Sequence, residues 1–112
     1  YLKFDNLYPH FSTIVLWKKD RYQPRHVDDD SNGNNKILWP RKVTAICYLN
    51  DNYIGGETFI ETESGHTYVS IPRKGSIVLF LSDNINPHGV NKIISGTRVT
   101  TSANTSGYPL CN

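Results

Sequence analysis

Hydrophobic and polar residues alternate along short stretches of this chain, and residues typical of turns separate the stretches. Successive side chains of a β-strand point to opposite faces of a sheet, so this alternation predicts strands. No segment repeats its apolar residues with the period of a helix. The predicted strands cover residues 12–17, 41–50, 57–62, 67–71, 76–81, 88–94 and 97–104.

Many short strands with frequent turns predict an all-β sandwich or barrel. We expect a jelly-roll barrel, because its mouth can gather side chains from strands that are distant in sequence. A polar connector at 18–25, an acidic and Asn-rich loop at 29–35 and a turn at 51–56 join the strands. A turn at 95–96 is expected to fold 97–104 back as the antiparallel partner of 88–94.

Composition limits the kind of protein that this can be. The 112 residues suffice for a single domain over 1–112. The net charge is only +2 and the basic residues are scattered, which argues against nucleic acid as a partner. No apolar run of about 18 residues predicts a membrane span, and no signal peptide is visible. The absence of methionine indicates a processed chain, an excised domain or part of a longer enzyme, so the compartment stays open.

Two histidines and an aspartate form the most informative pattern. His26 and Asp28 are two residues apart, so a strand end can direct both to one metal ion, and His88 follows far downstream. Two imidazoles and one carboxylate are the facial triad of non-haem Fe(II) sites. A His-x-Asp pair alone is a weak signal. The other histidines, His10 and His66, lack an acidic residue at a useful spacing and are expected at the surface or in ordinary hydrogen bonds.

A polar stripe near the C-terminus indicates where an acidic ligand would bind. Alternation places Arg98, Thr100 and Ser102 on one face of their strand. Inside a barrel these groups would need a polar ligand, and a guanidinium matches a carboxylate. Tyr48 could present its hydroxyl to the same carboxylate. The alternatives are that Arg98 faces solvent on an edge strand and that Tyr48 is a core residue with a surface hydroxyl.

Together these residues carry a family resemblance. The chain resembles the prolyl-hydroxylase branch, of prolyl 4-hydroxylase type, within the Fe(II)/2-oxoglutarate-dependent dioxygenases. The resemblance covers about residues 17–102. It rests on the order and spacing of six blocks: RHVDDD, RKVTAICYLND, GGETFI, IPRKGSIVLFL, PHGV and SGTRVTT.

The resemblance implies a double-stranded β-helix and an iron-dependent hydroxylase. His26, Asp28 and His88 would hold Fe(II), while Arg98 and Tyr48, with Thr100 beside them, would hold the cosubstrate 2-oxoglutarate. The reaction would consume O₂, release succinate and CO₂, and be supported by ascorbate. The substrate would be a peptide or protein residue, with proline as the leading candidate.

Some features depart from the family and leave alternatives open. Trp17 stands where a tyrosine is common, a nearby glycine is missing from WKKDRYQPRH, and the usual flanking helices are not evident. Trp39, in the loop 29–40, is either a substrate contact or a packing anchor. The substrate could instead be lysine, a free amino acid or another small molecule. A non-catalytic jelly-roll module that binds a metal or a sugar is the remaining alternative, and the oligomeric state is open.

Overall fold

The computed structural model describes residues 8–28, 41–82 and 86–106, and within them the chain forms strands, turns and loops. These residues contain no helix that is long and apolar enough to cross a membrane. The strands are β1 (Tyr8–Lys18), β2 (Gln23–His26), β3 (Arg41–Tyr48), β4 (Ile54–Gly55), β5 (Thr58–Glu61), β6 (Thr67–Ser70), β7 (Ile77–Leu81), β8 (His88–Val90), β9 (Ile93–Ser95) and β10 (Thr97–Ser106).

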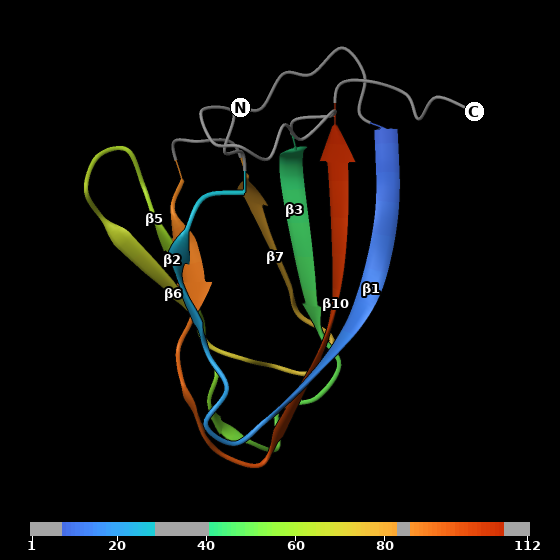
Figure 1. The fold of residues 1–112 in the computed structure, drawn as a ribbon, viewed down its shortest axis with the longest axis vertical. Coiled ribbons are helices and arrows are strands. Elements are labelled where there is room, and N and C mark those ends of the chain that lie inside the picture. The colour runs from blue at the N-terminus through green and yellow to red at the C-terminus, as the bar shows by residue number, and fades with distance from the viewer. Residues whose placement is uncertain (1–7, 29–40, 83–85, 107–112) are drawn as a thin grey trace.

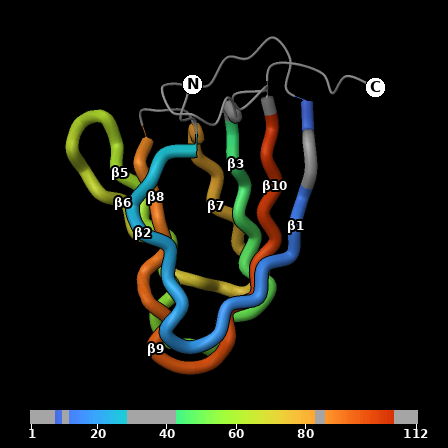
Figure 2. The backbone as a smooth tube through the Cα atoms, viewed as in Figure 1, coloured from blue at the N-terminus to red at the C-terminus, as the bar shows by residue number. Residues whose placement is uncertain are grey.

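The strands form two four-stranded antiparallel sheets that face each other (Figure 1). The sheet with the longer strands has the order β1-β10-β3-β7 and is called the larger sheet. The sheet with the shorter strands has the order β2-β8-β5-β6 and is called the smaller sheet. The short pair β4-β9 lies at the end where the two sheets converge (Figures 1 and 2). In the described part of the chain the two sheets are not joined into one closed hydrogen-bonded barrel. The all-β jelly-roll prediction is confirmed, in the form of two facing sheets.

Alternation along the two central strands of the larger sheet decides which residues face the smaller sheet. Along β10, Arg98 and Thr100 are buried, while Val99 between them is only half-buried. Along β3, Thr44 and Tyr48 are buried in the same way. The residues that alternation groups on one face of β10, beginning at Arg98, therefore point inward, and the alternative of a solvent-facing Arg98 does not hold.

A small apolar core lies between the two sheets. Tyr48, Val78 and Phe80 come from the larger sheet and Ile60 from the smaller sheet, with Ile46 packed against them. This cluster combines two neighbouring strands with one strand of the opposite sheet. It therefore fixes the distance between the sheets, while the inward polar residues lie beside it rather than within it.

The predicted hairpin of 88–94 with 97–104 is wrong. Asn91 and Lys92 interrupt the first segment, so it forms two strands, β8 and β9. β8 pairs with β2 and β5, β9 pairs with β4, and β10 pairs with β1 and β3. The turn at Ser95 and Gly96 therefore carries the chain from the short β4-β9 pair to the larger sheet.

Two short strands lie where the sequence predicted irregular structure. Asp20, with a φ of 71°, is part of the turn after β1, and the polar connector then forms β2. Its strand character comes from pairing with β8 rather than from its own residues. The expected turn at 51–56 contains β4, whose Gly55 approaches the Lys92 carbonyl so closely that a Cβ atom would collide with it.

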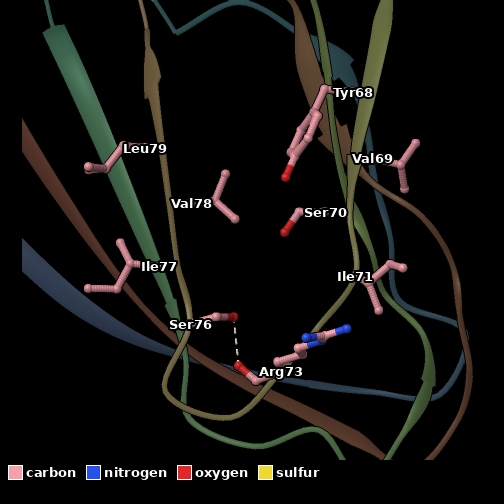
Figure 3. Close-up of a pocket in the computed structure, with 9 residues that line it drawn as sticks. All are labelled: Tyr68, Val69, Ser70, Ile71, Arg73, Ser76, Ile77, Val78 and Leu79. Atoms are coloured by element: carbon pink, nitrogen blue, oxygen red, sulfur yellow. Dashed lines mark hydrogen bonds between the residues drawn. The ribbon is translucent and has the colours of Figure 1, made fainter.

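A shallow groove of about 450 Å³ lies between β6 and β7, which are edge strands of the two sheets (Figure 3). Val78 and Ser70 lie on its walls, and Arg73 lies at one end. Ile77 and Leu79 belong to the apolar segment 76–81, but their side chains are 62% and 67% exposed. The inward face of β7 is thus buried, and its outward face is not covered by the described residues.

Candidate metal centre and adjoining cavity

His26, Asp28 and His88 come together at one end of the smaller sheet. His26 ends β2, His88 begins β8, and the two residues are Cα partners in the antiparallel pair. The Asp28 Oδ1 atom lies 3.3 Å from Nε2 of His26 and 3.4 Å from Nε2 of His88. One ligand atom from each residue falls within 4.8 Å of the others, so the three could hold a metal ion.

Hydrogen bonds to the backbone orient both imidazole rings. Nδ1 of His26 lies 2.9 Å from the Pro24 carbonyl oxygen, and Nδ1 of His88 lies 3.0 Å from that of Asn86. A carbonyl oxygen only accepts, so Nδ1 of each neutral ring carries the proton and Nε2 carries a lone pair. The two lone pairs and a carboxylate oxygen then face one another. A cation bound among these acceptors would be stabilised by all three.

This donor set fits a divalent transition metal. Neutral imidazole nitrogen and carboxylate oxygen suit iron and its neighbours, and bonds of about 2.1 Å place adjacent ligands roughly 3 Å apart. Asp28 and His88 have side chains only 8% and 6% exposed, whereas that of His26 is 30% exposed. The site is therefore open on the His26 side and closed on the side of the core.

The Arg98 side chain is buried at a second polar site. Arg98 is 2% exposed, and its Nε donates to the Gly56 carbonyl at 3.0 Å. Nη1 donates to Oγ1 of Thr100 and Nη2 to Oγ1 of Thr58, each at 3.2 Å. A guanidinium has five N–H groups, so these three bonds leave two for another partner.

The Arg98 charge has no carboxylate partner among the described residues. The guanidinium carbon lies 5.4 Å from the centre of the Trp17 ring and 5.5 Å from that of Tyr48. Aromatic faces stabilise a cation only partly, and a buried charge is costly when it is not neutralised. The arrangement is that of a binding site for an anion. Trp17, at the position where the resemblance leads one to expect tyrosine, contributes a ring face here rather than a hydroxyl.

Thr58 connects Tyr48 to Arg98, and the sequence analysis missed it. The Tyr48 hydroxyl lies 2.7 Å from Oγ1 of Thr58, and the Thr58 amide donates to that hydroxyl at 3.3 Å. Either hydroxyl can donate in the shorter contact, and one hydroxyl proton is left over in both cases. The Thr58 oxygen of this pair also accepts from Nη2 of Arg98. Thr58 could have been found as a polar residue that shares a strand face with the apolar Ile60.

Two neighbouring cavities lie at the triad of His26, Asp28 and His88 and at Arg98. The cavity at Arg98 has a volume of about 220 Å³, and the one at the triad has about 110 Å³. Their walls share Gln23, Ile46, Ser102 and Asn104. A small molecule with a carboxylate at one end and metal-binding oxygens at the other could therefore reach both sites at once.

Tyr53 is a half-buried tyrosine near Arg98. Its hydroxyl oxygen is buried and lies near the Arg98 guanidinium. Burial raises the pKa of Tyr53 to about 12, an effect that outweighs the charge and hydrogen bonding of Arg98, both of which lower it. The tyrosine therefore stays neutral at physiological pH.

Most of the side chains singled out from the sequence fall into these two sites. The triad residues meet as expected, and Arg98 bonds directly to Thr100. Tyr48 is linked to Arg98 by Thr58, whose hydroxyl is hydrogen-bonded to both side chains. His66 is exposed, in agreement with its expected surface position. Trp39 and the loop that contains it lie outside the described residues.

Comparison with known proteins identifies the family. Residues 11–105 match the family model of the 2OG-Fe(II) oxygenase superfamily. The chain belongs to this superfamily. It is 38% identical over 91 residues to human prolyl 3-hydroxylase 2, a match that covers 72% of the chain but only 13% of that protein. The chain thus spans a small part of this relative, and the activity of a whole relative does not transfer to it directly.

Solved structures of the superfamily share the fold. A 2OG-Fe(II) oxygenase from Burkholderia pseudomallei superposes with a TM-score of 0.76 at 17% identity, over 91% of this chain and 44% of that one. A Trichoplax adhaerens prolyl hydroxylase, in complex with a peptide fragment of hypoxia inducible factor, superposes with a TM-score of 0.71 at 22% identity, over 88% and 46%. These likenesses confirm the predicted double-stranded β-helix fold.

Proposed function

We propose that this chain is the catalytic domain of an Fe(II)- and 2-oxoglutarate-dependent dioxygenase that hydroxylates a proline residue of a peptide or protein. The observation that carries the proposal is the placement of two sites along one pair of adjoining cavities. Three metal-binding groups converge at one end, and a buried arginine without a carboxylate partner among the described residues lies at the other. In this proposal residues 1–112 belong to a single domain.

In this proposal His26, Asp28 and His88 hold Fe(II). Their hydrogen bonds to backbone carbonyls keep both Nε2 lone pairs directed at the metal position before it is filled. Bound Fe(II) with 2-oxoglutarate supplies the O₂ chemistry that hydroxylates a C–H bond and yields succinate and CO₂. The protein contributes binding, orientation and exclusion of water, and no other acid or base is required of it.

Arg98 binds the distal carboxylate of 2-oxoglutarate, with Thr100 and Tyr48 beside it. The two unused N–H groups of the guanidinium can form a paired contact with a carboxylate, and the free hydroxyl proton of the pair Tyr48 and Thr58 can add a third bond. A guanidinium also presents its donors in a planar fork that matches the two oxygens of a carboxylate. Because its surroundings are neutral and buried, the Arg98 guanidinium favours an anion over an uncharged ligand.

A peptidyl proline is the substrate that we favour. The relative at 38% identity is named a prolyl 3-hydroxylase, and the Trichoplax adhaerens neighbour was solved with a peptide. His26, the most exposed ligand, marks the side from which a chain could approach. Trp39 remains a predicted substrate contact, and ascorbate remains a predicted supporting reductant.

The test is production of succinate by the purified protein with Fe(II), ascorbate and 2-oxoglutarate, with and without a proline-rich peptide. We expect succinate to rise with the peptide and the peptide to gain the mass of one oxygen atom. Fragmentation of the product identifies the residue and the carbon that is hydroxylated.

Other outcomes would indicate the alternatives. Oxygen on lysine, or turnover only with a free amino acid or another small molecule, would keep the chemistry and change the substrate. Bound metal without succinate under any condition would favour a binding module and reject the proposed enzyme. A proline-rich peptide in which each proline is replaced by alanine is the matched substrate control.

A further inference from the structure

A chain of polar groups leads from the larger sheet to the Asp28 carboxylate. Thr44 in β3 and Asn104 in β10 are Cα partners on the inward face, and they are only 4% and 7% exposed. Oγ1 of Thr44 lies 3.0 Å from Oδ1 of Asn104 and 3.4 Å from Oδ2 of Asp28. A single hydroxyl thus stands between an amide and a metal-binding carboxylate.

The proton count decides how these groups are bonded. A threonine hydroxyl has one proton, and both neighbouring atoms, as placed, are oxygens that only accept. The Thr44 proton can satisfy only one of them. Rotation of the Asn104 amide by half a turn exchanges its oxygen and nitrogen, which have nearly the same shape. Its Nδ2 then donates to Thr44, and Thr44 donates to Asp28.

We propose that Thr44 and Asn104 are positioning residues that fix the Asp28 carboxylate as a ligand through one oxygen. The relay runs from Asn104 Nδ2 to Thr44 Oγ1 and from the Thr44 hydroxyl to Asp28 Oδ2. With Oδ2 engaged, Oδ1 is the oxygen left facing the Nε2 atoms of His26 and His88.

The relay controls how many positions around the metal the protein occupies. A carboxylate that is free to turn can bind a metal through both oxygens, which fills a position needed by another ligand. A carboxylate held at Oδ2 from behind binds through Oδ1 alone. Asn104 also lines both cavities, so the relay forms part of the wall between the metal-binding triad and Arg98.

The inference rests on the proposed metal site but not on turnover or on the substrate. The test uses Co(II) as the probe, because its visible absorption spectrum reports its coordination number. The whole chain is titrated with Co(II) without cosubstrate, as wild type and as Thr44→Val, Thr44→Ser and Asn104→Leu. Valine keeps the branched shape of threonine and removes only the hydroxyl.

We expect Thr44→Val to bind Co(II) about 10- to 100-fold more weakly and to shift its spectrum, as is typical when a group behind a metal ligand is lost. Thr44→Ser keeps the hydroxyl, so it should retain the Co(II) affinity and the spectrum of wild type. Asn104→Leu should act in the same direction, and the double variant should lose little more than Thr44→Val. Thr105→Val is the matched control, since Thr105 neighbours Asn104 in β10 but donates to the Val43 carbonyl.

Wild-type affinity and spectrum in a folded Thr44→Val protein would overturn the relay. Fully additive losses in the double variant would also overturn it, because two independent contacts would then be responsible. If the variants behave as expected but no succinate forms under any condition, the relay stands and the proposed enzyme fails. Circular dichroism of each variant separates loss of the fold from loss of the metal.

Discussion

His26 and His88 lie directly opposite each other on neighbouring antiparallel strands, with their ring centroids 4.4 Å apart. The pairing of β2 with β8 therefore sets the distance between the two imidazoles, while backbone carbonyls set the rotation of each ring. Positions separated by sixty-two residues in sequence (26 to 88) are thus neighbours in a ladder of hydrogen bonds. The site is built mainly on strands, which hold ligands more rigidly than loops do.

Removal of one imidazole should abolish metal-dependent turnover. His26→Ala leaves two ligands, and we expect succinate formation at saturating 2-oxoglutarate to fall to background. Metal titration of the same protein should show weaker binding. His66→Ala is the control, because His66 is exposed and distant from the triad in sequence. Undiminished turnover in His26→Ala would remove His26 from the site.

Substitution of Arg98 should raise the concentration of 2-oxoglutarate that is needed. A hydrogen bond to a charged group contributes about 1.5–3 kcal/mol, so Arg98→Gln should raise this requirement by about 10- to 100-fold. Arg98→Lys should lose less, because it keeps the charge. Arg73→Gln, at an exposed arginine, is the control.

A second measurement separates charge recognition from damage to the fold. A 2-oxo acid without the distal carboxylate should bind weakly to both wild type and Arg98→Gln. If the Arg98 variant discriminated between the two acids as strongly as wild type does, Arg98 would not be the carboxylate partner.

Loss of the Thr58 hydroxyl should destabilise the protein. Thr58→Val removes an acceptor from Arg98 and a partner from Tyr48, both of which are buried. Leaving buried polar groups unsatisfied costs about 1–3 kcal/mol, so the midpoint of denaturant unfolding should fall. Thr67→Val, at an exposed position of β6, should change it little. An unchanged midpoint in Thr58→Val would mean that these bonds are replaced by water.

Tyr53 should make stability depend on alkaline pH. The unfolded chain releases this proton near pH 10, whereas the fold holds it to about 12. Between these values the folded state binds more protons, so the free energy of unfolding falls as pH rises. The fall should be shallower in Tyr53→Phe. Tyr68→Phe, at a tyrosine that is 59% exposed, is the control and should keep the slope of wild type.

Gly89 should not tolerate a side chain. A Cβ atom there would lie 2.5 Å from the Phe59 ring and 2.6 Å from the Gln23 carbonyl oxygen, so the two neighbouring strands would have to separate. Gly89→Ala should destabilise the protein by about 1–3 kcal/mol. It should also weaken metal binding, because His88 is the adjacent residue. Ser95→Ala, at an exposed position, is the control. A Gly89→Ala protein with the stability and metal affinity of wild type would contradict this account.

The sequence predicted those parts of the structure that follow from local alternation. A period of two along a well-formed strand placed Arg98 and Thr100 on one face, and the structure shows that this face points inward. His26 and Asp28 were paired by the same rule.

Features that depend on pairing between distant segments could not be predicted in this way. β2 is a strand because β8 lies beside it, although its residues QPRH have little strand character. The turn at Ser95 and Gly96 has the residues of a hairpin, yet it connects two different sheets. Thr58 and Asn104 acquire their roles only through neighbours that are 40 and 60 positions away.

Burial of the Arg98 charge ties the stability of the whole fold to its ligand. Burial of the guanidinium carries a desolvation cost that a bound dicarboxylate would offset. A ligand that binds only the folded state adds RT ln(1 + [L]/Kd) to the free energy of unfolding, about 2.7 kcal/mol at a hundred times Kd. Cosubstrate should therefore raise the melting temperature, and the resistance of the protein to proteases should follow the supply of 2-oxoglutarate.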